Sequence, residues 1–252
     1  TNGPTLSDND RFGYAIANIG DLDGNGVNDL AVGAAHDDTT TDGNDHSHGA
    51  NSNIGAVHII FLNSDGTLTK QSVVINDSTT NGPDLEDGDY FGAGVEKIGD
   101  LDGNGVNDLA VGAEFDDGAG TDRGALHIIF LNSDGTLTKQ SVEINDSTID
   151  GPTLSDNDRF GSSVADIGDL DGNGVNDLAV GAYLDDGGGS NRGAVHIIFM
   201  DENSKYTVTI TESVSLTDET SRAAGVNLSE SVSLTDSISK TAGVNLSESV
   251  SL

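Results

Sequence analysis

The chain has 252 residues and a formal net charge of −33, from 43 Asp and Glu against 10 Lys and Arg. This charge excludes nucleic acid and anionic lipid surfaces as partners, because both repel a strongly acidic protein. The absence of Cys excludes a disulfide scaffold and thiolate metal sites, and 34 glycines with only 4% aromatic residues predict a lean core.

Three long repeats organise most of the chain. Thr-Asn-Gly-Pro at 1–4 returns at 80–83, and Asp-Gly-Pro at 150–152 opens the third copy. The first copy is the longest because it carries an insertion between Asp38 and Gly55. The predicted boundaries of the repeats are 1–79, 80–148 and 149–211, and a different sequence follows at 212–252.

Each repeat predicts four strands, which the first copy illustrates. Residues 11–19 read as a strand, an Asp/Gly/Asn-rich loop follows, and the apolar run 30–34 reads as the second strand. The run 56–62 is the third strand, and 67–76 follows the turn Asn63-Ser64-Asp65-Gly66 as the closing strand of a hairpin. The repeats show no helical period, so we expect an all-β fold of antiparallel sheets.

A comparison between copies supports the closing strand. Val74 of the first copy is Glu143 in the second, whereas the neighbours on both sides stay apolar. Alternation along a strand therefore places positions 74 and 143 on the outward side.

The tail consists of a shorter repeat of about 18 residues. Residues 212–229 and 230–247 are nearly identical, Ser/Thr-rich and free of aromatic residues. Alternating apolar positions between 226 and 234 predict short strands, as in a stalk. A low-complexity linker that becomes ordered only on pairing explains the same composition, and both readings stay open.

The nine residues from Asp21 to Asp29 occur unchanged at 100–108 and 169–177. Oxygen-bearing side chains at positions 1, 3, 5 and 9, with Gly at position 6 for a sharp reversal, allow a short loop to wrap around one hard cation. The expected ligands are the four side chains and the carbonyl oxygen of position 7. They are Asp21, Asp23, Asn25, Val27 and Asp29; Asp100, Asp102, Asn104, Val106 and Asp108; and Asp169, Asp171, Asn173, Val175 and Asp177.

Electrostatics favours a metal site over an acidic turn. Two carboxylates about 4 Å apart repel by roughly 1 kcal/mol in water and roughly 4 kcal/mol at an effective dielectric of 20. An EF-hand would require Glu at position 12, where this chain has Val32, Val111 and Val180. Five oxygens in a flexible loop suit Ca²⁺ better than Mg²⁺, so we predict about three Ca²⁺ per chain.

The same pieces surround every loop. Phe12-Gly13 precedes the first loop and Gly33-Ala34 follows it, and the pairs recur at 91–92 with 112–113 and at 160–161 with 181–182. This arrangement resembles the FG-GAP repeat of integrin α-subunit β-propellers and their prokaryotic relatives, over about residues 1–210. The resemblance implies a four-stranded propeller blade per repeat, a Ca²⁺ loop between its first two strands, and a role in adhesion and ligand binding outside the cell.

Two departures from that family matter. The Pro that follows Gly-Ala in the family is replaced by Ala35, Glu114 and Tyr183, which weakens the turn prediction at these positions. Propellers close with about four to eight blades, whereas three repeats are present. The chain is therefore expected to be part of a longer array, or to be completed by the tail or by neighbouring chains.

Other polar residues receive less specific predictions. His58, His127 and His196 share one strand position, where packing or a surface face is a better explanation than metal ligation or catalysis. The insertion places His36, His46 and His48 near several Asp residues, and a polar loop is favoured there over a second Zn²⁺ or Cu²⁺ site. Asn-x-Ser triplets, weak glycosylation signals, occur at Asn76, Asn145, Asn227 and Asn245.

No nucleophile with a base, carboxylate pair in a pocket or phosphate-binding loop is distinctive, so we do not expect an enzyme. A signal peptide and an apolar stretch of membrane-spanning length are not found, so the segment is expected to be soluble. The sequence predicts a calcium-binding adhesion or structural module of a larger secreted or cell-surface protein, with other surface proteins, glycans or copies of itself as partners. Two alternatives stay open: a filament or surface-layer subunit that assembles through tail strands, and an accessory domain of a secreted hydrolase.

Overall fold

A computed structural model describes residues 2–38, 53–149, 151–201 and 206–209. The chain divides into two compact units, Thr1–Glu212 and Ser213–Leu252, and all described residues belong to the first. The tail repeats and the histidines at 46 and 48 lie outside the described residues. Within the described ranges, no helix is long and apolar enough to span a membrane.

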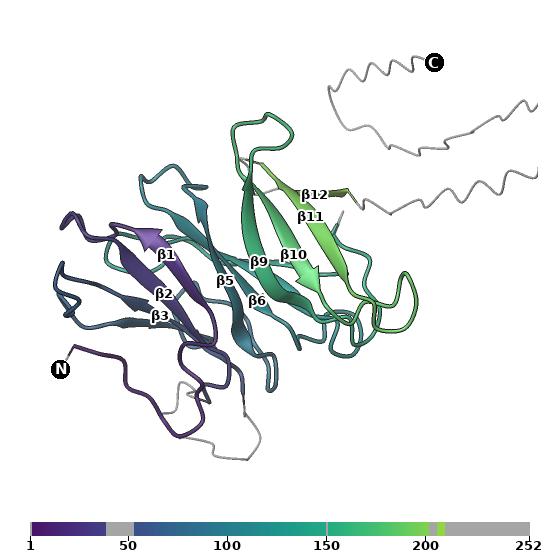
Figure 1. The fold of residues 1–252 in the computed structure, drawn as a ribbon, viewed down its shortest axis with the longest axis horizontal. Helices are drawn as coiled ribbons and strands as arrows, with labels where there is room; N and C mark the ends of the chain where they lie inside the picture. Colours follow the sequence, from purple (N-terminus) through teal and green to yellow (C-terminus); the bar gives the residue numbers. More distant parts are fainter. Residues whose placement is uncertain (1, 39–52, 150, 202–205, 210–252) are drawn as a thin grey trace, which may run out of the picture. The chain divides into compact units, whose positions relative to one another are not determined.

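The first unit contains three four-stranded antiparallel sheets, which we call blades 1 to 3 in chain order (Figure 1). In each blade the strands are hydrogen-bonded in sequence order. Blade 1 contains β1 (Ile16–Gly20), β2 (Asp29–Ala34), β3 (Ala56–Ile60) and β4 (Val73–Ile75). Blade 2 contains β5 (Phe91–Gly99), β6 (Asp108–Ala113), β7 (Ala125–Ile129) and β8 (Val142–Ile144). Blade 3 contains β9 (Phe160–Gly168), β10 (Asp177–Ala182), β11 (Ala194–Met200) and β12 (Tyr206–Thr209).

The all-β prediction of four strands per repeat is thus confirmed, but the first strand of the first copy begins later than predicted. β1 starts at Ile16, whereas β5 and β9 start at the corresponding phenylalanines, Phe91 and Phe160. These two phenylalanines form parallel bridges to Gly55 and Gly124 of the preceding blade. Phe12 has no preceding blade among the described residues, so the start of its strand lacks this pairing partner.

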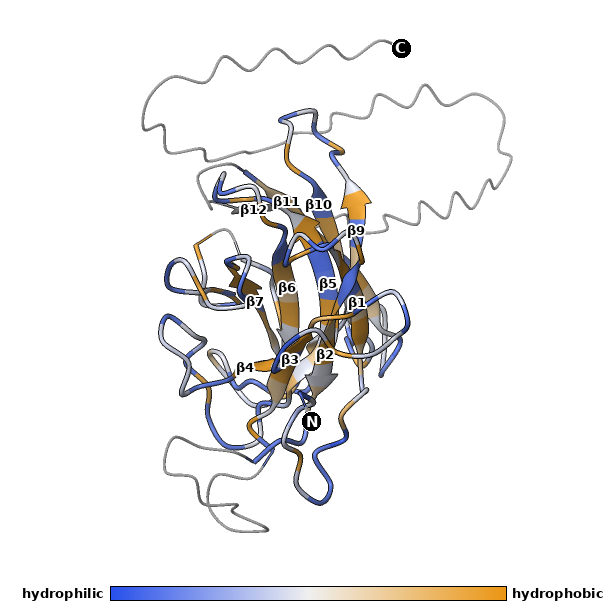
Figure 2. Ribbon diagram, turned by 90° about the vertical axis from the view of Figure 1, so that its left-hand side faces the viewer, coloured by the Kyte–Doolittle hydropathy of each residue, from blue (hydrophilic) through white to orange (hydrophobic). Residues whose placement is uncertain are grey.

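The blades pack face to face. We call the face turned toward the preceding blade the front face and the other the back face. Apolar side chains from the back of blade 1 and the front of blade 2 form one buried cluster, including Ile59, Phe61 and Val111. Leu126 and Phe130 from the back of blade 2 form the second cluster with the front of blade 3. Much of the apolar colour in Figure 2 lies in the strands, and much of the polar colour lies in the loops.

Glycine permits the close approach of neighbouring blades. An added Cβ at Gly33 would lie 2.1 Å from the carbonyl oxygen of Gly92, and one at Gly112 would lie 1.8 Å from that of Gly161. Both distances are far below van der Waals contact. The backbone of the Phe-Gly pair of one blade therefore packs directly against the Gly-Ala pair of the blade before it.

The turn after Gly-Ala forms without the family's Pro. The backbone N–H groups of Asp37, Asp116 and Asp185 donate to the carbonyl oxygens of Ala34, Ala113 and Ala182, at 2.9, 3.2 and 3.2 Å. The closing strand was predicted to turn positions 74 and 143 outward. Val74 is exposed, as predicted, whereas Glu143 is half-buried.

Candidate metal sites

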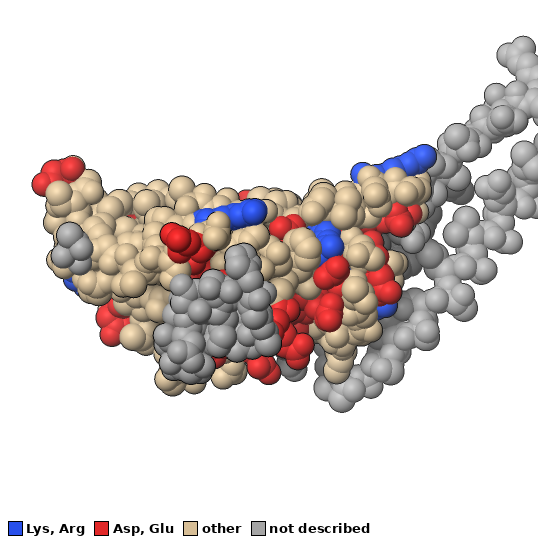
Figure 3. Space-filling model, turned by 90° about the horizontal axis from the view of Figure 1, so that it is seen from below, with Lys and Arg blue, Asp and Glu red and all other residues tan. Residues whose placement is uncertain are grey.

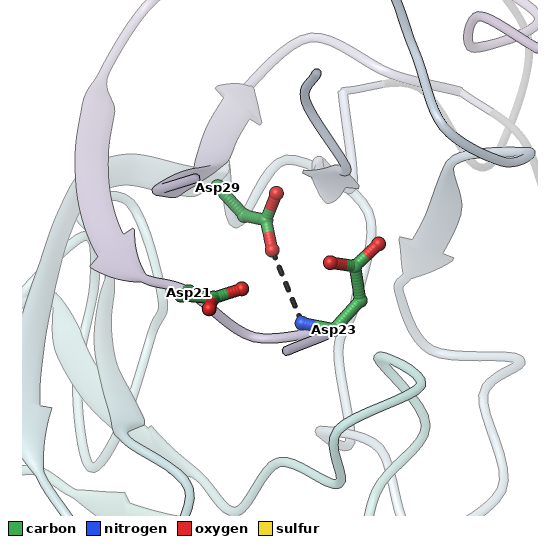
Figure 4. A group of neighbouring side chains, drawn as sticks. All are labelled: Asp21, Asp23 and Asp29. Carbon is green, nitrogen blue, oxygen red and sulfur yellow. Dashed lines mark hydrogen bonds between the residues drawn. The ribbon is translucent and has the colours of Figure 1, made fainter. Parts of the chain in front are cut away.

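Each repeated Asp/Gly/Asn loop joins the first two strands of its blade and brings three carboxylates together. The clusters are Asp21, Asp23 and Asp29; Asp100, Asp102 and Asp108; and Asp169, Asp171 and Asp177. In every cluster one oxygen of each carboxylate lies within 4.8 Å of the other two. Figure 4 shows the side chains of Asp21, Asp23 and Asp29 converging on the interior of the first loop.

The first Asp of each loop folds the loop around itself. In the first loop, the two carboxylate oxygens of Asp21 accept the N–H groups of Asn25 and Gly26 at 2.9 and 2.8 Å. Gly24 and Gly26 adopt φ angles of 77° and 86°, in the left-handed region that a side chain disfavours. In the third loop, N–H donation led by that of Gly174 lowers the pKa of Asp169, so this carboxylate is held in its charged form.

The last Asp of each loop is buried and links the loop to the third strand. Asp29 Oδ2 accepts the N–H groups of Leu22 and Asp23 at 2.9 and 3.3 Å, the second of which Figure 4 marks. Its Oδ1 accepts the N–H of Leu62, just beyond β3, at 2.8 Å. Asp108 makes the same bridge to Leu101 and Leu131. Burial raises the pKa of Asp108 to about 6, although these two hydrogen bonds act to lower it. Asp177 repeats the bridge to Leu170 and Met200.

The middle Asp supplies the clearest sign that an ion would fit. Asp23 Oδ2 accepts the hydroxyl of Thr69 at 3.0 Å, whereas its Oδ1 is buried and finds no hydrogen-bond partner in the described part of the chain. An unpaired buried carboxylate oxygen is costly. A hard divalent cation among the three carboxylates would satisfy it and would reverse the repulsion between them.

The fourth predicted side-chain ligand is engaged elsewhere. Asn25 Oδ1 accepts the N–H of Val27 at 2.7 Å, and its Nδ2 donates to the carbonyl oxygen of Leu62 at 2.9 Å. Asn104 and Asn173 make the same two bonds in their own loops. The structure therefore brings together the three Asp of each loop, while ligation by the Asn side chains and by the carbonyl oxygens of Val27, Val106 and Val175 stays a prediction.

Two sets of supporting residues were missed by the sequence reasoning. Thr69 and Thr138 hold the middle Asp, through hydroxyl bonds of 3.0 Å to Asp23 and 2.6 Å to Asp102. The backbone N–H groups of Leu62, Leu131 and Met200 hold the last Asp. The repeated Thr-Leu-Thr at 67–69 and 136–138 is a sequence signal for the first set, whereas backbone donors leave no signal.

Neighbouring loops also contact each other. Asn107 in the second loop donates through Nδ2 to the carbonyl oxygen of Ile19 at 3.0 Å. Asp21 and Asp23 line a pocket together with Gly105 and Val106 of the second loop. The first and second loops therefore lie side by side where blade 1 meets blade 2.

The repeated histidines pack in the blades, as the sequence analysis favoured. His58, His127 and His196 are buried, each edge-on to the Phe of its own Phe-Gly pair at 5.3–5.5 Å between ring centroids. Burial lowers the pKa of His127 to about 4. His36, just before the insertion, packs edge-on against Tyr90.

Two of the glycosylation triplets are poorly placed for modification. Asn76 and Asn145 are buried, and their Oδ1 atoms accept the N–H and hydroxyl of Ser78 and Ser147. A glycan requires an accessible amide nitrogen, so the structure argues against these two positions. Asn227 and Asn245 lie outside the described residues.

Four-stranded antiparallel blades that interlock through Phe-Gly and Gly-Ala pairs, each with an acidic loop between its first two strands, define a β-propeller-type repeat protein. Residues 160–198 match the family model described as FG-GAP repeat. The chain is 33% identical over 171 residues to integrin alpha-PS5 of Drosophila melanogaster, covering 68% of this chain and 15% of the relative. It is 32% identical over 175 residues to integrin alpha-5 of Xenopus laevis, again covering 68% and 15%.

Integrin alpha-IIb of Homo sapiens is 32% identical over 188 residues, covering 73% of this chain and 15% of the relative. The chain is therefore an integrin α-like FG-GAP repeat protein. It spans only about 15% of the length of these relatives.

Proposed function

We propose that this chain is an extracellular calcium-binding module of a larger surface protein, in which one Ca²⁺ per blade stiffens the blade for adhesion or structural support. The observation that carries the proposal is the convergence of three carboxylates in every loop, with one buried Asp23 oxygen left unpaired. The integrin α-like FG-GAP family supports the adhesive role and the location outside the cell. Catalysis forms no part of the proposal.

Calcium bound in the loop would stabilise the folded blade. Asp21 and Asp23 shape the loop, and Asp29 ties it to the end of β3, so an ion among them would join the first three strands of the blade. Binding to the folded state alone raises stability as the ligand concentration rises above its dissociation constant. With the affinity typical of extracellular sites, about micromolar to millimolar, the module would be stiff outside a cell and less stable in the low calcium of a cytoplasm.

The test is a calorimetric titration of metal-free protein with Ca²⁺, which we expect to give about three ions per chain. Replacing Asp21, Asp100 or Asp169 by Ala should remove one ion each. Unchanged stoichiometry in these three variants would contradict the ligand assignment, and the absence of binding heat together with an unchanged melting temperature would contradict the proposal itself.

A matched pair within one loop separates metal binding from folding. Asp21→Ala and Asp29→Ala should both lose the ion, but only Asp29→Ala leaves the N–H groups of Leu22 and Leu62 without their acceptor. In excess chelator we therefore expect Asp29→Ala to lower the free energy of unfolding by about 2–4 kcal/mol. Asp21→Ala should lower it by about 1 kcal/mol or less, because the N–H groups of Asn25 and Gly26 are exposed and can bond to water instead. Urea unfolding of both variants in chelator measures the difference.

A further inference from the structure

The two interfaces between blades are built from the same parts. The N–H of Phe91 donates to the carbonyl oxygen of Ile54, and that of Phe160 donates to Arg123, both at 2.9 Å. In each case the Phe-Gly pair on the front of one blade enters a socket on the back of the blade before it. The socket consists of the glycine of the Gly-Ala pair and the residues that open the third strand.

The front of blade 1 retains the geometry of a docked edge although no blade covers it among the described residues. Arg11 has a φ of 54°, close to 59° at Tyr90 and 64° at Arg159, the corresponding residues of blades 2 and 3. Gly13 has a φ of 95°, the same as Gly92. This left-handed backbone is disfavoured for Arg, yet it forms without a partner, so the edge is preorganised for docking.

The back of blade 3 retains an open socket. Gly193 has a φ of 74°, compared with 94° and 87° at Gly55 and Gly124, which receive Phe91 and Phe160. The three atoms nearest to an added Cβ at Gly181 would be the hydroxyl oxygens of Ser162 and Ser163 and the Ser163 Cβ, whereas at Gly33 and Gly112 they would be backbone atoms of the next blade. An added Cβ at Gly193 would lie 3.0 Å from the carbonyl oxygen of Tyr183 in its own blade, whereas those at Gly55 and Gly124 would lie 2.1 and 2.0 Å from the carbonyl oxygens of Phe91 and Phe160 of the next blade. In the described residues, no backbone of a following blade therefore occupies this position.

Apolar side chains that are buried at the internal interfaces are exposed on both free faces. On the back of blade 3, Val195 is 68% exposed, whereas its counterparts Val57 and Leu126 are fully buried. Leu170 is 58% exposed, against 6% and 7% for its counterparts Leu22 and Leu101. On the front of blade 1, Ile16 is 62% exposed, against 7% for Val95.

The charges on the two faces are also complementary. At the interface between blades 2 and 3, the Arg123 guanidinium Nε donates to Asp156 at 2.9 Å. Arg192 is the counterpart of Arg123 on the open back face, and Asp8 is the counterpart of Asp156 on the open front face. Both Arg192 and Asp8 are exposed, so opposite charges would meet if one face docked on the other.

We propose that the back face of blade 3 binds the front face of blade 1 of a second copy of this chain. Phe12-Gly13 of the second copy would enter the socket at Gly181 and Gly193, with Phe12 N–H donating to the carbonyl oxygen of Arg192. Two copies supply six blades, within the range of about four to eight in which propellers close. The contact is head-to-tail, and a rotation that closes gives a ring.

The first test is the mass of the whole 252-residue chain in millimolar Ca²⁺, measured by light scattering over two decades of concentration. We expect the mass of two chains, and a larger head-to-tail assembly would also support the contact. A single-chain mass at every concentration would overturn the proposal and would leave a further FG-GAP repeat outside these 252 residues as the occupant of the faces.

The second test assigns the contact to these faces. Ile16→Glu blocks the front face and Val195→Glu blocks the back face, and both positions are exposed, so the fold should be retained. Each variant alone should be monomeric, whereas an equal mixture should form a two-chain complex, because one intact pair of faces remains. Ile149→Glu, at an exposed position on neither face, is the control and should associate like the parent chain.

Circular dichroism and the melting temperature of the monomeric variants check that they are folded, and neither readout depends on the calcium proposal. Association that survives both Ile16→Glu and Val195→Glu would overturn the proposal and point to the tail repeats instead. Failure of the two variants to combine in the mixture would overturn it as well.

Discussion

At the scale of single residues, the same side-chain type plays opposite electrostatic roles in different places. Asp21 is exposed and accepts two backbone N–H groups, whereas Asp89 and Asp116 are buried beside the strands of blade 2. Burial, reinforced by neighbouring acidic residues, raises the pKa of both Asp89 and Asp116 to about 7. These two carboxyl groups are therefore protonated or half-protonated near neutral pH.

The raised pKa values predict that these residues make the protein less stable as the pH rises. The unfolded chain releases the proton near pH 4, whereas the folded protein holds it until about pH 7. Their stabilisation is thus fully present below about pH 4 and is lost as the pH rises through about 7. Asp116→Asn mimics the protonated group, so its stability relative to the parent should increase from pH 4 to pH 8, by up to about 4 kcal/mol for a shift of this size.

Urea unfolding in saturating Ca²⁺ at several pH values measures this effect. The neighbouring Asp117 is exposed, so Asp117→Asn is the control and should show a much smaller pH-dependent difference. A difference between parent and Asp116→Asn that stays constant with pH would contradict the burial argument.

At the scale of elements, a strand in this protein is defined as much by the next blade as by its own sequence. The segment Asp-Leu-Ala-Val-Gly-Ala is identical in β2, β6 and β10. It is almost fully buried in blades 1 and 2 and partly open in blade 3. The difference arises because only the first two copies are covered by a following blade in the described residues.

This difference predicts a position-dependent effect of one substitution. Gly112→Ala places a methyl group against the Gly161 backbone and should lower the free energy of unfolding by about 1–3 kcal/mol or more. Gly181→Ala meets only serine side chains and should change it by less than about 1 kcal/mol. Both are compared by thermal unfolding in the Val195→Glu background, so that association does not contribute, and equal effects would contradict the interlocking of blades.

At the scale of the whole molecule, repulsion between the acidic side chains opposes folding, and cations in the loops or in the solvent would reduce it. Acidic side chains outnumber basic ones on the face drawn in Figure 3, in keeping with the formal charge of −33. Self-repulsion of this size destabilises a compact state. Ions that bind in the loops or screen the surface should therefore both stabilise the fold.

Screening can be separated from binding by salt. In excess chelator, the melting temperature should rise by several degrees from about 10 mM to about 1 M NaCl, because the Debye length falls from about 30 to about 3 Å. In saturating Ca²⁺ the same change of salt should have a smaller effect, since the loop charges are already neutralised. A melting temperature of the chelated protein that is independent of salt would show that surface repulsion is not limiting.

The sequence by itself determined the strand order within each blade and the position of the acidic loops. Alternation and Gly punctuation are local signals, and the unchanged run Asp21–Asp29 marks the loop in every copy. The Phe-Gly and Gly-Ala pairs were visible too, but their meaning depends on two segments far apart in the chain lying against each other.

Only the tertiary structure decided which groups each loop brings together. It showed that Asp29 bridges to Leu62, that the Asn25 side chain bonds to backbone groups, and that Asp23 keeps an unpaired oxygen. It also decided that β1 begins at Ile16 and that Val195 stays exposed while Val57 is buried. These outcomes depend on whether a neighbouring blade packs against the residue, and the local sequence, which is identical in the repeats, does not determine that.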